Sequence, residues 1–346
     1  MTSDDTVTGD TNAAGTGDEA ANPPATDSRS GLLVVLILFL STAIDLFFFT
    51  GFYSSDDVSY FGYAVNLLRD EHYKVGFSNS RLTLVGWNLL VILAVGWRVQ
   101  IVAASYIFFH QALNLATFFL ARRLFDTRVA LLATYSVATL SLMVVFSTCI
   151  SPDIPIALFS VLSLYAFLRG LDADRAGRRR SAYLWLACAG ISVAFGYMAK
   201  ESALILLPFY FVLWLYDGWR GNKWLLFKRG TMFAAGFFTM LAAEFAVLSY
   251  LNQGAYFRLG WVTAEMDEKE RAFIGRHGIN PIERLQHVDN RLNAFFVPRC
   301  GKTFAIVCLA VFPFVRRRRW CLPAMALWTF GYLTFGSIRW GEYLPS

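Results

Sequence analysis

Long apolar runs separated by short polar segments make up most of the sequence after residue 30. A helix of about 20 apolar residues is long enough to cross a hydrocarbon core of about 30 Å. The pattern therefore predicts an all-α polytopic membrane protein, a bundle of about nine transmembrane helices. The predicted spans are 31–50, 99–120, 129–149, 153–170, 183–199, 202–217, 231–251, 302–315 and 320–338.

Basic residues gather in short loops between these runs, and this clustering predicts which way the chain faces. Short loops rich in Lys and Arg face the cytoplasm. With the N-terminus in the cytoplasm, every such cluster falls on that side: Arg122, Arg123 and Arg128, then those within 171–182, 218–230 and 316–319. The apolar stretch 82–97 is then an interfacial or re-entrant helix, because a full span there would turn all later clusters outward.

Two long segments, 51–98 and 252–301, face outward in this topology. The second is expected to hold a helix at about 263–276 and an amphipathic helix at about 281–295 that lies on the outer membrane surface. At the other end, residues 1–30 are polar and acidic and are expected to form a disordered cytoplasmic tail ahead of a transmembrane domain, 31–346. The chain stops on the outer side after SIRWGEYLPS, which suggests a truncated form of a longer protein.

The composition narrows the class of protein further. Hydrophobic residues make up 56% of the chain and charged residues only 16%, against about 25% charged residues in soluble domains. The net charge of +6 comes with the loop clusters, so it indicates topology and not a nucleic-acid partner. The five cysteines lack CxxC spacing and indicate neither a disulfide framework nor a metal site.

An acidic pair, Asp56–Asp57, follows the first span in SSDDVSYFGYAVNLL. Ser54 or Ser55 can cap a helix from about Val58 to Arg69. The pair then lies at the N-terminus of that helix, where the helix dipole favours negative charge. Alternatively, the pair supplies a general base at the membrane surface, where repulsion between the two carboxylates raises one pKa. The spacing alone leaves both interpretations open.

Further charged residues lie at the outer ends of spans. Asp153, in SPDIPIALF, is either the N-cap of the fourth span or a site carboxylate, and Lys200–Glu201 occupy a tight outer turn before the sixth. The lysine either snorkels to the interface or holds a phosphate beside an outward cavity. Four outer arginines are either interfacial anchors or ligands: Arg81, Arg98, Arg258 and Arg339.

Three ionisable residues lie inside spans, Asp45, His110 and Glu244. Such groups are functional candidates by default, but His110 and Glu244 can also be packed and hydrogen-bonded within the bundle, and Asp45 can reach the interface. The acids and the lysine of the separate outer turns can converge on one outward cavity, which suggests chemistry on a phosphorylated lipid.

The sequence resembles the GT-C glycosyltransferases of the family 39 type, which include protein O-mannosyltransferases and bacterial lipid A aminoarabinose transferases. Four pieces carry the resemblance, in order, over about residues 31–216: SSDDVSYFGYAVNLL, LARRLFDTRVALLATY, SPDIPIALF and AKESALILLP. The resemblance implies an inverting sugar transfer from a polyprenyl-phosphate donor to a lipid, glycan or protein acceptor. The expected place is the outer face of a bacterial inner or plasma membrane.

The resemblance also implies roles for residues. Asp56 takes the position of the base, and Asp57 stands where the family typically has Glu. Asp153 matches the acid that opens the fourth span, and Lys200, with Arg81, is expected to bind the donor phosphate. The remaining residues expected at the substrate are Glu201, Arg258, Arg339 and Tyr343. This scheme requires no divalent metal and does not exclude one.

Two other functions stay open from the sequence. A transporter or flippase of lipid-linked sugars favours inverted repeats and charges near the midplane, whereas this chain has no evident repeat and carries most of its candidate charges at outer ends. The other possibility is an inactive, truncated homologue that serves as a partner subunit.

Overall fold

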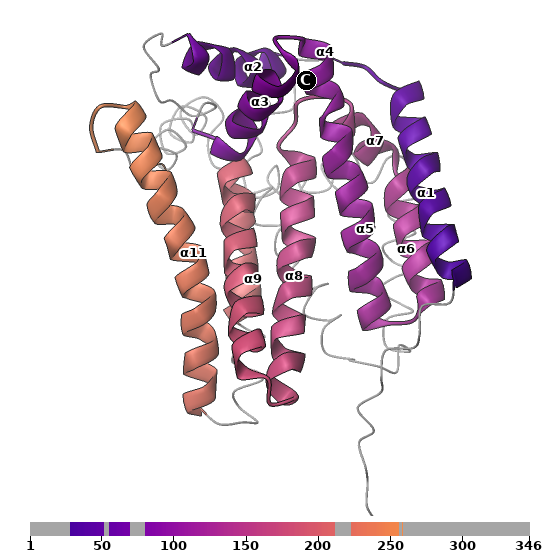
Figure 1. The fold of residues 1–346 in the computed structure, drawn as a ribbon, viewed down its shortest axis with the longest axis vertical. Coiled ribbons are helices and arrows are strands. Elements are labelled where there is room, and N and C mark those ends of the chain that lie inside the picture. Colours follow the sequence, from indigo (N-terminus) through magenta and orange to yellow (C-terminus); the bar gives the residue numbers. More distant parts are fainter. Residues whose placement is uncertain (1–27, 52–54, 70–79, 212–222, 256–257, 259–346) are drawn as a thin grey trace, which may run out of the picture.

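The structure is a computed structural model that describes residues 28–51, 55–69, 80–211, 223–255 and 258. These residues form helices and turns and contain no strand. Long helices stand side by side, and short helices lie across one end of them (Figure 1). The predicted all-α polytopic fold is confirmed.

Five helical segments of the described residues are long and apolar enough to cross a membrane. They are α1 (Ser28–Phe47), α4 (Val99–Ala104) with α5 (Tyr106–Leu124), α8 (Asp153–Arg175), α9 (Arg179–Ala199) and α11 (Lys223–Leu251). A sixth is formed if α6 (Thr127–Thr139) and α7 (Ser141–Ser147), bent by 59° at their junction, make one span. The predicted span 202–217 is described only to residue 211 and opens with the 3-10 helix η1 (Glu201–Ile205), while 302–315 and 320–338 lie outside the described residues.

Two short helices, α2 (Ser55–Leu68) and α3 (Leu82–Val95), lie across one end of the bundle, which we call the α2–α3 end (Figure 1). The 14 residues of α3 give a helix of about 21 Å, too short to cross a hydrocarbon core. This agrees with the interfacial interpretation of 82–97. Helix α2 begins three residues before the predicted Val58, so both acids of the pair lie inside its first turn.

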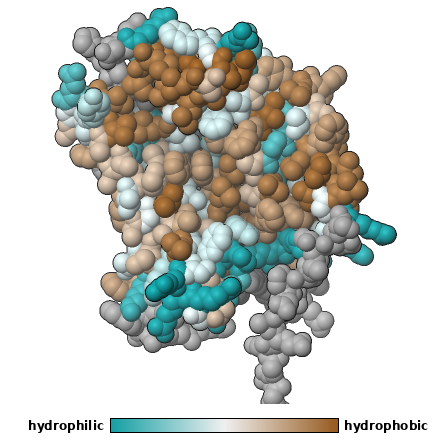
Figure 2. All heavy atoms as spheres, viewed as in Figure 1, coloured by the Kyte–Doolittle hydropathy of each residue, from teal (hydrophilic) through white to brown (hydrophobic). Residues whose placement is uncertain are grey.

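The described basic turns lie at the opposite end, together with the start of α1 (Figure 1). Figure 2 shows hydrophilic residues there, below a largely hydrophobic flank. The predicted topology places the N-terminal end of the first span and the basic clusters on the same side of the membrane. The described part of the chain has this arrangement. The cluster at 316–319 lies outside the described residues.

Local signals define the turns at this basic end. Asp126 caps α6, because its side chain accepts a hydrogen bond of 2.9 Å from the amide of Val129. Gly177, at φ +74°, ends α8: the amide of Arg178 bonds to the carbonyl of Ala173 at 2.8 Å. That bond is the signature of a left-handed helix end that glycine favours. The turn reverses the chain, so α9 returns antiparallel to α8.

Helices α9 and α11 pack closely through two glycines. A methyl carbon at Gly190 would overlap the backbone of Phe233 on α11, and one at Gly236 would overlap the backbone of Ala187 on α9. Small residues at such a crossing let two membrane helices approach at backbone distance. This contact fixes α11 beside the α8–α9 hairpin.

Candidate active site

Lys200 and Asp153 form an ion pair at the α2–α3 end. The antiparallel hairpin of α8 and α9 brings them together, because Asp153 opens α8 and Lys200 follows the last residue of α9. The Lys200 Nζ lies 2.7 Å from the Asp153 Oδ1, and the Ser151 hydroxyl donates to the Oδ2 at 2.8 Å. The two side chains are 28% and 33% exposed. This pair is therefore accessible to a ligand.

The structure excludes one of the alternatives that the sequence left for this pair, the capping role of Asp153. Pro152, not Asp153, is the N-cap of α8, and no side-chain cap bond is made there. The carboxylate of Asp153 instead bonds to Ser151 and Lys200. Lys200 is likewise held by an acid of the protein and not merely extended toward the interface.

A second set of charges is buried beside this pair. Arg258 donates to Glu201 and, at 2.9 Å, to Glu244 on α11, and its side chain is 1% exposed. Arg81, just before α3, donates to the hydroxyl of Tyr60 on α2 and lies 3.9 Å from Glu201. We call Arg81, Glu201, Glu244 and Arg258 the buried network.

The members of the buried network compensate one another. An isolated charge in such an environment costs several kcal/mol. Burial raises the pKa of Glu201, but Arg258 and Arg81 lower it more, so the pKa lies below its usual range and the group is a carboxylate at neutral pH. Burial lowers the pKa of Arg258, and the nearby Glu201 and Glu244 raise it above its usual value. Glu201 and Arg258 are thus an ionised pair.

The acidic pair on α2 belongs to the same region. Asp57 is buried, at 4% exposure, and its carboxylate acts electrostatically on the Cys149 thiol, as does that of Asp153. The positive charge of Arg81 in turn attracts the carboxylate of Asp153. Asp56 lies in the same first turn of α2. Five elements therefore contribute to one region: α2, the start of α3, the α8–α9 hairpin, η1 and α11.

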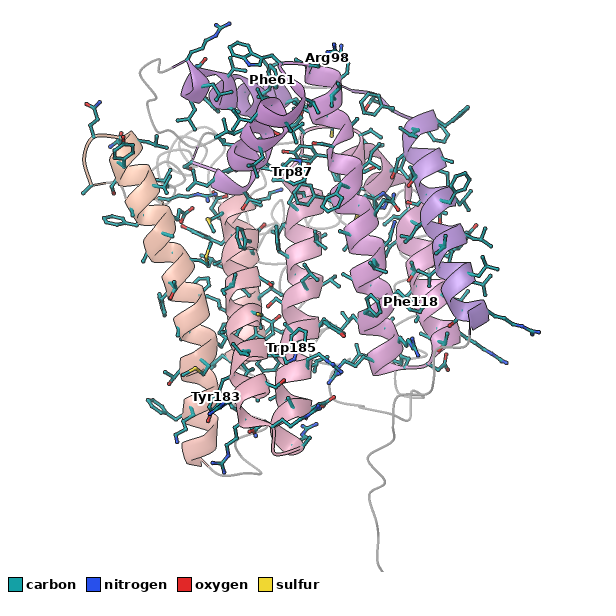
Figure 3. The ribbon with its side chains drawn as sticks, in the orientation of Figure 1. Phe61, Trp87, Arg98, Phe118, Tyr183 and Trp185 are labelled. Carbon is teal, nitrogen blue, oxygen red and sulfur yellow. The ribbon has the colours of Figure 1, made fainter. Side chains whose placement is uncertain are left out.

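Aromatic residues surround this end of the bundle. Trp87 of α3 stacks on Phe108 at 5.6 Å between ring centroids, and its indole nitrogen donates to Ser105 at 2.8 Å. Figure 3 shows Phe61, Trp87 and Arg98 at the α2–α3 end and Tyr183 near the opposite end. Arg98 is exposed, in keeping with an interfacial anchor.

Some of the predicted candidate residues lie outside the described residues, and others lie elsewhere in the bundle. Arg339, Tyr343 and the outer helices expected within 252–301 lie outside the described residues. Asp45 and His110 pair with each other inside the bundle. Among the described residues, no group of three or more His, Cys, Asp or Glu side chains is placed to hold a metal ion.

Sequence reasoning missed two residues that support the site, Tyr60 and Ser151. Both stand in the motifs already quoted. Tyr60 lies four residues after Asp56, which places the two on one face of a helix. Ser151 precedes Asp153 by two residues, the spacing at which a hydroxyl reaches a nearby helix start. Spacing from the acids, four residues for Tyr60 and two for Ser151, was thus the available signal.

Apolar helices long enough to cross a membrane, with a charged cluster at one end, indicate an integral membrane protein with a candidate site close to the bilayer surface. Residues 97–263 match the model of the family described as dolichyl-phosphate-mannose-protein mannosyltransferase, a GT-C family. The predicted resemblance to a GT-C glycosyltransferase is therefore confirmed over this part of the chain. The match includes Asp153, Lys200, Glu201 and Arg258, and it begins after Arg81 and the acidic pair. Comparisons with curated proteins and with solved structures found no match.

Proposed function

We propose that this protein transfers a sugar from a polyprenyl-phosphate donor to a lipid, glycan or protein acceptor, with inversion at the anomeric carbon. The observation that carries the proposal is the accessible Lys200–Asp153 pair, which adjoins a buried network in a segment matching a mannosyltransferase family. By the distribution of basic turns, the α2–α3 end faces outward and the N-terminus is cytoplasmic. The transfer then takes place at the outer membrane surface.

Lys200 binds the donor phosphate in this proposal. Its ammonium is partly exposed and already held toward an anion. A cation in that position stabilises the charge that develops on the phosphate as it leaves. Arg81, a member of the buried network, adds positive charge to the same region. Glu201 holds Arg81 in place and is itself paired with Arg258. Arg339 and Tyr343 remain predicted contributors.

Asp56 is the general base in this proposal. The acceptor oxygen forms the new bond to the anomeric carbon, and its proton passes to the Asp56 carboxylate. The bond from that carbon to the phosphate oxygen breaks, and the polyprenyl phosphate leaves with the electron pair. Asp57 and Asp153 shape the sugar or acceptor site. A positioned base of this kind is worth roughly 10²–10⁴-fold in rate.

A transfer assay tests the base assignment. The purified protein is given a radiolabelled polyprenyl-phosphate sugar and candidate acceptors, and wild type is compared with Asp56→Asn. The rate is expected to fall at least ~100-fold, since the amide cannot take the proton. Asp126→Asn is the matched control, because the same chemical change occurs at the basic end and asparagine still caps α6. A near-normal rate for a folded Asp56→Asn protein would show that the base lies elsewhere.

The same preparation separates this function from the two rivals. If lipid-linked sugar crosses the bilayer of proteoliposomes while no donor is consumed, the protein is a transporter. If it transfers nothing by itself and activity returns only when a second protein is added, the partner-subunit interpretation holds.

A further inference from the structure

A polar cluster lies deep among α1, α5 and α7, and the proposed reaction does not use it directly. Asp45, His110 and Ser147 are each 0% exposed. The His110 Nδ1 lies 2.9 Å from the Asp45 Oδ2, and the Ser147 hydroxyl donates to the Asp45 Oδ1 at 2.9 Å. Gln111 adds an amide donor to the same carboxylate at 3.1 Å.

Both ring nitrogens of His110 face acceptors. Nδ1 lies against the Asp45 carboxylate, and Nε2 lies 3.4 Å from the backbone carbonyl of Val137. A ring nitrogen that carries a proton can donate to such a neighbour, so the imidazole can link the Asp45 carboxylate to the α6 backbone. Removing one partner would leave a charge, or an unpaired polar group, in the membrane interior.

The pair contacts both sides of the bend in the α6–α7 span. Val137, bonded by His110, lies in the last turn of α6, just before the 59° bend. Ser147, bonded to Asp45, is the last residue of α7. Regular helix bonds are interrupted at a bend of this size, and His110 of α5 contacts the Val137 carbonyl there, while Asp45 of α1 holds the far end of α7 through the Ser147 hydroxyl.

The chain beyond the bend leads directly into the candidate site. Thr148 bonds to Thr50, three residues after the end of α1, with 3.0 Å between their hydroxyl oxygens. Ser151 and Asp153 follow after a short turn. Thr50 itself precedes α2 and its acids by a few residues. The cluster thus ties together the two segments that carry the acids of the site.

We propose that Asp45 and His110 are positioning residues for the transfer reaction. The hydrogen bonds of this pair hold the α6–α7 bend against α1 and α5 and thereby set Asp153 against Lys200. The catalytic part of this inference rests on the proposed function, whereas the placement of the bend can be measured without any substrate.

A crosslinking experiment measures the placement of the bend. Thr50→Cys and Thr148→Cys are introduced together with Cys149→Ser, and the yield of the 50–148 disulfide is determined by mass spectrometry. The yield is compared between the otherwise unchanged protein and Asp45→Asn/His110→Gln. Asn and Gln form hydrogen bonds and introduce no charge, so the protein is expected to fold, but it loses the ring that reaches Val137. We expect a several-fold lower yield, and an unchanged yield overturns the proposal.

Kinetics then distinguish positioning from a purely structural role. In Asp45→Asn/His110→Gln, we expect kcat to fall about 10-fold or more, because small displacements of a reacting group are costly. The donor KM is expected to stay near its wild-type value, because Lys200 follows α9 and does not lie in the segment beyond the bend. A double variant with wild-type kcat overturns the proposal. Absence of transfer by the wild-type protein counts against the proposed function instead, and the crosslink still decides the placement.

Discussion

At the scale of single residues, burial divides the charged side chains of the α2–α3 end into two groups. Lys200 and Asp153 are about one-third exposed, whereas Arg258 and Glu201 are almost fully enclosed. A ligand can reach the first pair without disturbing the fold. Arg258 and Glu201 instead supply a fixed electrostatic field and hold in place the elements that carry Lys200 and Asp153. The distinction was invisible in the sequence, where all four are charges at the outer end of a span.

Arg258 gives the first prediction at this scale. Arg258→Ala removes the cation that pairs with Glu244 and leaves Glu201 with Arg81 alone. The loss of one partner from a buried pair costs about 3–5 kcal/mol. We expect a large drop in the midpoint of unfolding, followed by heating or by denaturant in detergent. Arg98→Ala is the matched control, since Arg98 is exposed at the same end and its loss is expected to cost within about 0.5 kcal/mol. Equal effects of the two substitutions would contradict the buried network.

Glu201 gives a second prediction, on pH. Its folded-state pKa lies below its usual value because of Arg258 and Arg81. The carboxylate therefore contributes stability that is fully present above the ordinary glutamate pKa of about 4.3 and is lost as pH falls through the lower folded value. The stability advantage of wild type over Glu201→Gln is expected to be constant near neutral pH and to shrink in acid. An advantage that grows as the pH falls would show that the pKa shift has the opposite sign.

At the scale of elements, the site depends on helix ends that are held in place by close helix packing. The α8–α9 turn at Gly177 sets the register that brings Asp153 beside Lys200. The glycine contact between α9 and α11 holds α11, which carries Glu244, beside α9, which leads into Lys200 and Glu201. Neither contact lies in the site, yet each decides which side chains meet there.

Alanine substitutions test the α9–α11 contact. Gly190→Ala and Gly236→Ala each force backbone apart, and such overpacking typically costs about 1–3 kcal/mol. We also expect lower activity, because α11 carries Glu244. The control is Gly86→Ala on α3, where an added methyl carbon meets nothing within 4 Å. Alanine there is expected to be neutral or slightly stabilising, by up to about 1 kcal/mol. Similar losses at all three positions would rule out a specific role for the contact.

At the scale of the whole molecule, hydropathy and basic turns predicted most of the arrangement. The length of the apolar runs predicts the spans. The side of the membrane on which the basic clusters fall correctly excluded 82–97 as a span. The 59° bend between α6 and α7 was not predicted, because the sequence is apolar on both sides of it. Ion-pair partners such as Arg258 and Glu244 were not predicted either. Their pairing depends on which helices pack together, and a charge pattern along the chain does not encode that.

The orientation of the bundle is a prediction that labelling can test. By the positive-inside rule, the α2–α3 end faces outward. A cysteine at Arg98 is expected to react with an impermeant maleimide on intact cells. One at Arg178, which is also exposed but lies at the basic end, is expected to react only after the membrane is opened. Both are introduced with Cys188→Ser, because Cys188 is itself exposed. The reverse pattern of labelling would place the candidate site in the cytoplasm.

The central claim is that the charged α2–α3 end is where a sugar leaves a lipid phosphate, and the most direct measurement is the single-turnover transfer rate with a polyprenyl-phosphate sugar. Lys200→Gln removes the proposed phosphate cation, whereas Lys228→Gln makes the same change on an exposed lysine at the basic end. We predict a loss of about 100-fold or more for Lys200→Gln and a near wild-type rate for Lys228→Gln. A folded Lys200→Gln protein that transfers sugar as fast as Lys228→Gln would contradict the claim.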